Sequence, residues 1–495
     1  MKKHLLLLLI ILLPAGIFSQ TSSSLKYAGE IDSLNLKSVL VTLASKEFEG
    51  RDTGEKGGEM AQDYITGLLK ENQIPSPKSI DYLQNIEVKR GYSMEKEFLY
   101  KGKNYSKEYH YSNNYDQETI LTVDQLVFAG YGVHDSLYND FENIDISNKA
   151  VLLLAEGAPT NKYGVRYDTS VKKIPDREYM KSKNVKALFL IERNNNNMPY
   201  HFFRWPWVFW SKEKETTTTL PEVTISEELA NRILDSSDKT VKQLYFEIER
   251  DGKSFPFIIH DKVSLKGDLS YEPLNANNII AFIEGSDLKN EFIVLSAHYD
   301  HLGMNGKDIF YGANDNASGV SAAMEIARIL KKAQKEKKGP RRSVIILLTT
   351  AEEKGLHGAR YYVENPVFPL AQTVGCINLD MLGRINDEYM NSDSTYVYLS
   401  FEKTQSQPIV CLAEEAGMDV GKFNIVQDSY REQKGHFEFS DHYVFHEKGI
   451  PSIMLSNGMF PEFHKPTDTA DKIDYKSLYD RTKFAFLLLW KYANP

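Results

Sequence analysis

Two adjacent carboxylates, Glu352 and Glu353, follow an apolar run at 343–351 that has the composition of a buried strand. Other potential metal ligands follow three further apolar runs: His298 and Asp300 after 292–297, Asp380 after 374–379, and His464 beyond 451–456. Ligands of open α/β sheets bind beyond the carboxyl ends of the strands, so we expect these side chains to face one crevice. Histidine nitrogen and carboxylate oxygen bind zinc, and the pattern therefore predicts a metal site.

A site for two metal ions needs roughly five protein ligands, one of which bridges ions about 3.5–4 Å apart. Five imidazole and acidic side chains supply that number, namely His298, Asp315, Glu353, Asp380 and His464. Asp315 belongs to the glycine-flanked segment 312–319 before an expected helix. Small residues there let the backbone bend and let a substrate approach.

Two more carboxylates have positions that suit supporting roles. Glu352 is next to a ligand candidate but points elsewhere at a strand end, where a general base for a water molecule would lie. Asp300 follows His298 by two residues, and a carboxylate that near can accept the second ring N–H of a ligating histidine. Each feature alone has a structural explanation, such as a solvated pair or a helix N-cap. Their joint position at successive strand ends favours a catalytic interpretation.

The elements that must position these side chains alternate between strand and helix patterns. This alternation predicts an α/β fold with a mostly parallel, doubly wound mixed sheet and helices on both faces. Beyond the four apolar runs, a strand is expected at 278–283 and helices are expected at 317–332, 358–364, 407–416 and 441–448. Helical spacing also recurs within 31–72, on both sides of a glycine-rich turn at 48–58.

Length and pattern predict more than one domain in the 495 residues. A new unit with its own strand patterns starts near residue 121, and the strand-rich pattern of the main domain resumes near 255. We therefore expect a leader at 1–19, the N-terminal part of the main domain at 20–120, a smaller inserted α/β domain at 121–250, and the main part at 251–495.

The first residues have the pattern of a secretory signal. Lys2 and Lys3 precede nine apolar residues at 5–13, and a cut is expected near Ser19. The apolar stretch is short for a membrane span, so we expect an exported protein, periplasmic or secreted, with no membrane association after removal of the leader. The net charge of −9 argues against a nucleic-acid partner, since such proteins usually carry a basic stripe.

Five segments of the last 220 or so residues resemble, in order, the motifs of the M28 zinc peptidases. They are Ser296-Ala-His-Tyr-Asp-His-Leu-Gly303, Gly312-Ala-Asn-Asp-Asn-Ala-Ser-Gly319, Thr350-Ala-Glu-Glu-Lys-Gly-Leu-His-Gly358, Asn378-Leu-Asp-Met-Leu-Gly383 and Phe463-His-Lys-Pro-Thr-Asp468. Residues 43–54 look like the opening segment of this family. Phe128-Ala-Gly-Tyr-Gly132 is similar to a protease-associated (PA) domain, which some members carry as an insert.

The resemblance implies a co-catalytic aminopeptidase with a phosphorylase/hydrolase-like α/β fold, two zinc ions per chain and peptide substrates. Asp315 would bridge both ions. His298 and Asp380 would complete one site, and Glu353 and His464 would complete the other. The peptide bond after Asp315 is expected to be cis.

The same resemblance implies catalytic roles for two further residues. Glu352 would take a proton from the attacking water and pass it to the leaving amine, and Asp300 would orient His298. Many relatives have a tyrosine shortly before the Ser-Asp-His run, here 440–442, which helps to hold the developing oxyanion. No tyrosine fills that position. Tyr430, His436 and Tyr443 are three alternatives.

Three alternative functions use the same residues. Some relatives cyclise N-terminal glutamine with a single zinc, although the loop at 314–319 is more like that of the hydrolases. A carboxypeptidase-type relative is the second alternative. A non-catalytic binding protein on the same fold is the third, and it is disfavoured because all five ligand candidates and Glu352 are present. The preferred N-terminal residue and the oligomeric state have no signal in the sequence.

Overall fold

The structure is a computed structural model that describes residues 23–105, 109–111, 119–155, 157, 159–160, 175–192, 208–210, 220–386, 396–421, 423–429 and 436–495. The expected leader at 1–19 lies outside these ranges. The chain forms two compact units, the first made of Met1–Ile86 with Leu274–Pro495 and the second of Glu87–Pro273. Among the described helices, none combines the length and apolar composition that a membrane span requires.

The first unit contains an eight-stranded mixed sheet. Its strands, in spatial order, are β1 (Leu83–Asn85), β13 (Asn277–Ile283), β17 (Arg342–Thr349), β14 (Leu288–His298), β18 (Thr373–Leu379), β21 (Ser452–Ser456), β19 (Tyr396–Phe401) and β20 (Asn424–Ser429). The four central strands β17, β14, β18 and β21 are parallel to one another. Their carboxyl ends therefore meet at one edge of the sheet.

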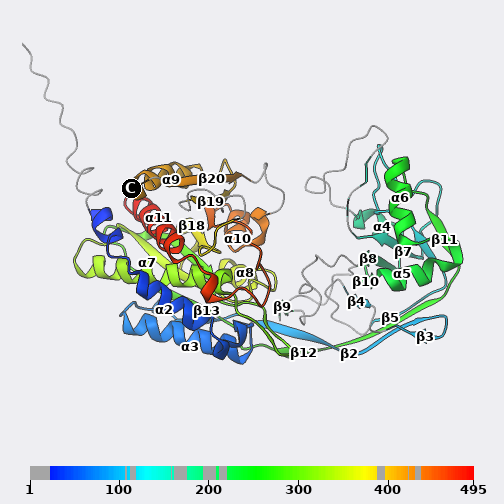
Figure 1. Ribbon diagram of the computed structural model, residues 1–495, viewed down its shortest axis with the longest axis horizontal. Helices are drawn as coiled ribbons and strands as arrows, with labels where there is room; N and C mark the ends of the chain where they lie inside the picture. Colours follow the sequence, from blue (N-terminus) through cyan, green and yellow to red (C-terminus); the bar gives the residue numbers. More distant parts are fainter. Residues whose placement is uncertain are drawn as a thin grey trace, which may run out of the picture. The chain divides into compact units, whose positions relative to one another are not determined.

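Helices cover both faces of this sheet because its central strands are apolar on both sides. In β14, Ile293 and Leu295 face a core shared with α2 (Ser33–Leu43), α3 (Lys56–Glu71), α7 (Gly319–Lys335), α9 (Gln407–Val420) and α11 (Tyr475–Ala493). Phe292 and Val294 face the opposite core, with α8 (His357–Glu364) and α10 (His442–Glu447). Figure 1 shows α2, α7 and α11 packed on one side of the unit.

The observed α/β class, mixed sheet and two helical layers confirm the predicted fold class. The expected helices at 317–332, 358–364, 407–416 and 441–448 correspond to α7, α8, α9 and α10. The glycine-rich segment expected as a turn at 48–58 overlaps the end of the short helix η1 (Lys46–Arg51) and the first turn of α3. Strand β20 forms one edge of the sheet and β19 lies next to it, and the sequence patterns predict neither strand.

The second unit has two sheets of its own. One has the order β11 (Phe257–Ile259), β6 (Leu126–Phe128), β7 (Ala150–Leu154), β8 (Ala187–Glu192), β10 (Glu222–Ser226) and β4 (Tyr109–Tyr111). The other has the order β3 (Lys103–Asn104), β2 (Val88–Tyr100), β12 (Val263–Pro273) and β5 (Thr119–Val123), with β9 (Val208–Trp210) paired to β2. Helices α5 (Glu227–Leu234) and α6 (Val241–Asp251) pack on one face of the six-stranded sheet, and α4 (Arg177–Ser182) packs on the other.

This unit is wider than the inserted segment expected at 121–250. The reason is the antiparallel pairing of β2 with β12, which joins residues 89–100 to residues 263–273. The two strands lead out of the first unit and back to it, so the chain between them is an insertion by topology. Its assignment as a PA-like domain stays a prediction.

Candidate metal centre

The predicted site residues follow the parallel strands of the first unit. His298 is the last residue of β14, Asp380 follows β18 directly, and Glu352 and Glu353 come shortly after β17. Neighbouring parallel strands bring these three strand ends to one edge of the sheet. Two further side chains reach the same edge from loops: Asp315 from the turn η3 (Ala313–Ser318), and His464 from the segment after β21.

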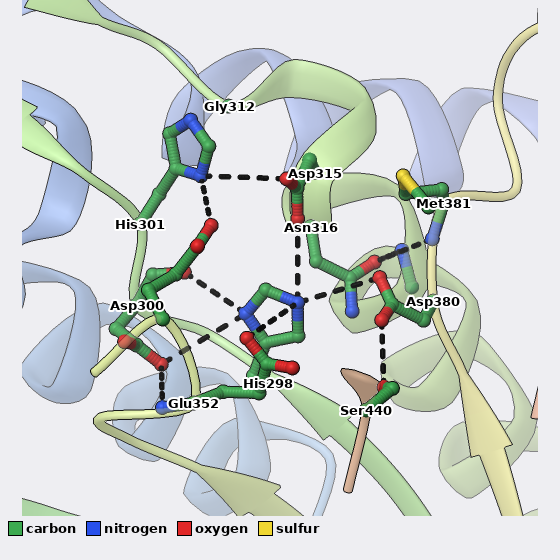
Figure 2. Close-up of polar contacts among 12 residues, drawn as sticks. His298, Asp300, His301, Gly312, Asp315, Asn316, Glu352, Asp380, Met381 and Ser440 are labelled. Carbon is green, nitrogen blue, oxygen red and sulfur yellow. Dashed lines mark hydrogen bonds and ion pairs between the residues drawn. The ribbon is translucent and has the colours of Figure 1, made fainter. Parts of the chain in front are cut away.

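His298 is surrounded by carboxylates. Its Nε2 atom lies 3.3 Å from Oδ1 of Asp315, 3.4 Å from Oδ1 of Asp380 and 3.9 Å from Oε2 of Glu352. Figure 2 shows these carboxylates converging on the ring nitrogen. An imidazole and two carboxylates so arranged can hold one cation.

His464 forms a second, similar group with two carboxylates. Its Nε2 atom lies 3.2 Å from Oδ2 of Asp315 and 3.1 Å from Oε2 of Glu353. Asp315 therefore directs one carboxylate oxygen to His298 and the other to His464. This is the arrangement that a bridging ligand between two metal ions requires.

The spacing of these atoms fits zinc. Zinc binds imidazole nitrogen and carboxylate oxygen at about 2.0–2.2 Å in tetrahedral geometry, so two ligands of one ion lie about 3.3 Å apart. The shortest separations within the two groups are 3.1, 3.2, 3.3 and 3.4 Å. Oxygen and nitrogen donors without thiolates also suit other divalent ions.

The electrostatics of the cluster also fit a cation. Burial opposes a charge on His298, yet the neighbouring carboxylates of Glu352 and Asp380 raise its pKa well above the usual value. Burial likewise opposes a charge on Asp315, but hydrogen bonds with His298 and His464 hold its pKa well below the usual value. The pKa of His464 rises to about 10, against the effect of burial, because of Glu353 and Asp315. Buried carboxylates in this excess need positive charge, which protons or metal ions can supply.

Glu352 lies close enough to the cluster to be a ligand by distance alone. Ligand atoms of His298, Glu352 and Asp380 lie within 4.8 Å of one another, as do those of His298, Asp315 and Glu353. Burial raises the pKa of Glu352 well above the usual value, and Glu353 and Asp380 add to this effect against that of His298. A buried carboxyl with a raised pKa beside a metal group can act as a ligand or as a general base.

Asp300 contacts His298 through its backbone as well as its side chain. The carbonyl oxygen of Asp300 lies 3.1 Å from Nδ1 of His298, and its carboxylate oxygen Oδ1 lies 3.8 Å away. The carboxylate instead accepts hydrogen bonds from the backbone N–H of Glu352 and from the hydroxyl of Thr53, both at 3.2 Å. Asp300 therefore joins the ligand side of the cluster to the segment that carries Glu352 (Figure 2).

The loop that carries Asp315 is held by a residue that sequence reasoning gave no role. The buried carboxylate of Asp468 accepts the backbone N–H groups of Asn314 and Asp315 at distances of 3.0 and 3.1 Å. Burial raises the pKa of Asp468 to about 7 despite these bonds. The peptide bond between Asp315 and Asn316 is cis, as the family resemblance implies. Asp468 ends the fifth resembling segment, which was the available signal for it.

His301 is a second residue without a predicted role. It is fully buried, and its Nδ1 atom lies 2.7 Å from Oε1 of Glu353 and 3.8 Å from Oδ2 of Asp315. Gly312 makes room for the ring, since a Cβ atom there would lie 2.5 Å from two ring carbons of His301. His301 is part of the first resembling segment, three residues after His298, so the sequence signalled its position but not its partner.

On the other side of the cluster, Asp380 is fixed by a chain of hydrogen bonds. The hydroxyl of Ser440 donates to Oδ2 of Asp380 at 2.7 Å and accepts from the side-chain amide of Asn378 at 2.7 Å. Ser296 donates in turn to Oδ1 of Asn378 at 2.7 Å. Oδ1 of Asp380 is left to face His298 (Figure 2).

Of the three candidates for an oxyanion-stabilising residue, Tyr443 is the one whose side chain lies in the described part of the chain. Tyr430 and the side chain of His436 lie outside the described part of the chain. The ring of Tyr443 is half-buried, with centroids of Phe437 and His446 at 5.8 and 6.2 Å. The role stays unassigned among the three.

Comparisons with known proteins find similarity over the part of the chain that carries this site. A model of peptidase family M28 matches residues 278–488. Aminopeptidase YwaD of Bacillus subtilis is 30% identical over 218 residues, which cover 41% of this chain and 42% of that protein. A glutaminyl-peptide cyclotransferase of Drosophila melanogaster is 26% identical over 232 residues, 44% of this chain and 63% of that one. The chain thus matches less than two thirds of the length of either relative.

A likeness to a solved structure extends over both units of the chain. An aminopeptidase from Aneurinibacillus sp. strain AM-1 aligns with a TM-score of 0.62 over 95% of this chain and 96% of that one, at 18% identity. At this identity the likeness concerns the fold.

Proposed function

We propose that the protein is an exported zinc aminopeptidase of peptidase family M28, whose model matches residues 278–488, and that it removes N-terminal residues from peptides. The observation that carries the proposal is the position of Asp315, whose two carboxylate oxygens lie 3.3 Å from His298 and 3.2 Å from His464. One carboxylate shared by two histidine-containing groups suits two metal ions side by side.

The ligands divide between two ions. His298 and Asp380 would hold one ion, Glu353 and His464 would hold the other, and Asp315 would contact both. Zinc bound there would polarise the carbonyl of the scissile peptide and lower the pKa of a water molecule. The five side chains are at most 10% exposed, which strengthens every charge interaction within the site.

Glu352 is the general base of the proposal. Its carboxylate lies at the rim of the His298 group, 3.9 Å from Nε2, farther than Asp315 or Asp380. It would take a proton from the attacking water and give that proton to the leaving amine. The backbone N–H of Glu352 donates to Asp300, and this hydrogen bond fixes the segment that carries the Glu352 side chain.

Substitution of Glu352 tests this role. Glu352→Gln keeps the size of the side chain and removes its ability to take a proton, so kcat should fall by about 10³-fold while zinc content stays near two per chain. Aminoacyl-nitroanilide hydrolysis and metal analysis of the same preparation measure both. Glu364→Gln, an exposed position on α8, is the matched control. Normal turnover by Glu352→Gln would remove Glu352 from the mechanism.

The second candidate function is cyclisation of N-terminal glutamine. The identity of 26% with a glutaminyl-peptide cyclotransferase favours it. Both activities need a free N-terminal amine, so the discriminating assay compares glutaminyl peptides with other aminoacyl peptides. The aminopeptidase proposal expects release of the first residue from several peptides and no ring closure. Ring closure of glutaminyl peptides without hydrolysis of the others would favour the cyclase.

The proposal extends to the rest of the chain. Residues 1–19 would direct export to the periplasm or the exterior, and the second unit, Glu87–Pro273, would be the PA-like insert. N-terminal sequencing of the secreted protein tests the leader, with a first residue near position 20 expected. Protein that retains Met1 would contradict cleavage.

A further inference from the structure

Three consecutive residues far upstream of the matched family segment contact the site. Arg51, Asp52 and Thr53 lie at the end of η1, more than 200 residues before position 278, where the family match begins. All three are buried. Their partners are the loops that carry His298, Asp315 and the Glu352–Glu353 pair.

Arg51 binds backbone carbonyls at both ends of the segment 299–312, which leads to Asp315. Its guanidinium donates to the carbonyl oxygens of Tyr299, Leu43, Tyr311 and Gly312 at 2.7–2.9 Å. Burial lowers the pKa of Arg51 to about 10, so the group stays charged at neutral pH. It is thus a fixed positive charge that holds the chain before Asp315 by three backbone oxygens and joins it to a fourth, that of Leu43 at the end of α2.

Asp52 contacts the other strand end. Its Oδ1 atom pairs with Nζ of Lys354 at 3.0 Å, and the two side chains are only 11% and 7% exposed. Lys354 directly follows Glu353, which belongs to the proposed ligand set. An ion pair with little exposure resists screening by salt and fixes the backbone next to Glu353.

Thr53 joins the two remaining segments through its hydroxyl. This hydroxyl donates to Oδ2 of Asp300 at 3.2 Å and accepts the backbone N–H of Ala351 at 3.0 Å. Asp300 uses its other oxygen to accept the N–H of Glu352. The hydroxyl therefore closes a ring of contacts around the backbone that carries Glu352.

The tripeptide 51–53 is tightly packed against the neighbouring backbone. Gly50, immediately before it, has φ +71, and a Cβ atom there would lie 2.4 Å from the carbonyl oxygen of Phe310. Gly303 has φ +76, and a Cβ atom there would lie 2.6 Å from Cβ of Asp52. Arg51 itself has a positive φ of 55, which costs energy outside glycine and persists only where contacts enforce it.

We propose that Arg51, Asp52 and Thr53 are positioning residues of the catalytic site, each holding one of the loops that carry its ligands and its base. The inference rests on the proposed function, because it assigns Glu352 as the base. It extends the working site to an N-terminal segment outside the matched family domain. A contribution to folding alone would affect stability without affecting turnover by the folded enzyme.

Thr53 offers the sharpest test because valine matches its shape and serine keeps its hydroxyl. In the full chain with zinc bound, Thr53→Val should lower kcat by about 10- to 100-fold, with KM changed less than threefold. Thr53→Ser should restore kcat to within about threefold of the parent. Thr66→Val is the matched control, since this buried threonine on α3 has a hydroxyl that finds no hydrogen-bond partner among the residues the structure describes.

Turnover, zinc affinity by titration calorimetry and melting temperature are measured on each variant. Parental kcat and zinc affinity in Thr53→Val, or an equal loss in Thr53→Ser, would overturn the inference. Loss of zinc affinity in Thr53→Val but not in Thr53→Ser would support it. If Thr53→Val does not fold, Asp52→Asn decides: a tenfold lower kcat supports the inference, and a parental value overturns it.

Failure of the proposed function has a different signature. A parent protein that binds zinc but hydrolyses no aminoacyl substrate would refute the aminopeptidase. The zinc affinities of Thr53→Val and Thr53→Ser relative to the parent would still test whether this tripeptide positions the ligands.

Discussion

Both units of the chain bury carboxylates, but they satisfy them in different ways. In the first unit, the carboxylates of Asp315, Glu353 and Asp380 face the imidazoles of His298 and His464 at one edge of the sheet. In the second unit, the buried Asp140 accepts the backbone N–H groups of Tyr131 and Val133 at 3.0 and 2.9 Å.

The difference separates a cation site from a backbone support. Oδ2 of Asp140 accepts from backbone N–H groups nine and seven residues earlier in the chain, so the position of this carboxylate is explained without a cation. The carboxylates of the site in the first unit come from separate segments of the chain and outnumber their donors, which leaves negative charge for an ion to neutralise. Burial of an acid alone is thus a poor indicator of function, whereas convergence of several acids on imidazoles is a good one.

The largest effect is expected where the two metal groups share a residue. Asp315→Ala removes the one carboxylate among the described residues that contacts both His298 and His464, so zinc content should fall below one per chain and kcat/KM by about 10⁴-fold. Asp140→Ala in the second unit should leave both values within about twofold. Metal analysis measures the zinc content of both variants, and nitroanilide hydrolysis measures their kcat/KM. Equal losses in Asp315→Ala and Asp140→Ala would refute the distinction between a cation site and a backbone support.

Removal of metal should destabilise only one unit. Zinc present at about 1,000 times its dissociation constant stabilises the folded state by about 4 kcal/mol. We expect chelation to speed hydrogen exchange in β14, β17 and β18 and to leave β7 and β8 unchanged. Mass spectrometry of peptides from each unit measures this. Uniform change in both units would contradict a site confined to the first.

The second unit should have its own dependence on pH. Burial raises the pKa of Asp140 from 3.8 to about 6, so the folded state binds a proton between about pH 4 and pH 6 that the unfolded chain does not. Its free energy of unfolding should therefore fall as pH rises through this window, by at most about 3 kcal/mol.

Asp140→Asn is neutral at every pH and can still accept both backbone N–H groups. It should flatten that dependence, as measured by hydrogen exchange of β6 and β7 at pH 4, 5 and 6, with aminopeptidase activity unchanged. A slope equal to that of the parent would show that another group titrates.

A smaller effect is expected from the histidine that supports one metal group. His301 contacts Glu353 at 2.7 Å, so His301→Phe should weaken binding of one zinc by about 10- to 100-fold and leave the other unchanged. His301→Gln can still donate a hydrogen bond and should lose less. Zinc titration that resolves two affinities measures the difference. Equal loss of affinity for both zinc ions would contradict a role for His301 at one metal group only.

Much of the fold could be predicted because the central strands are apolar on both faces and end at polar residues. Strands β19 and β20 were missed: Tyr396, Tyr398 and Ser400 alternate with Val397 and Leu399, and no ligand candidate marked the end of either strand. The limits of the second unit were also beyond sequence patterns, because they depend on the pairing of β2 with β12 across more than 150 residues.

The candidate site likewise has residues that the sequence predicts and contacts that it does not. Residues at strand ends, such as His298 and Asp380, could be predicted because the sheet determines where they converge. The partners of His301, Asp468 and Thr53 could not, because each hydrogen bond joins segments between 52 and 298 residues apart. Sequence motifs identify such residues, whereas the contacts that give them a role depend on tertiary packing.

The most direct measurement is anomalous scattering at the zinc edge from crystals of the full chain grown with zinc. The account predicts two peaks per chain, one between His298 and Asp380 and one between Glu353 and His464, with Asp315 in contact with both. A single peak, or two peaks that do not share Asp315, would contradict it.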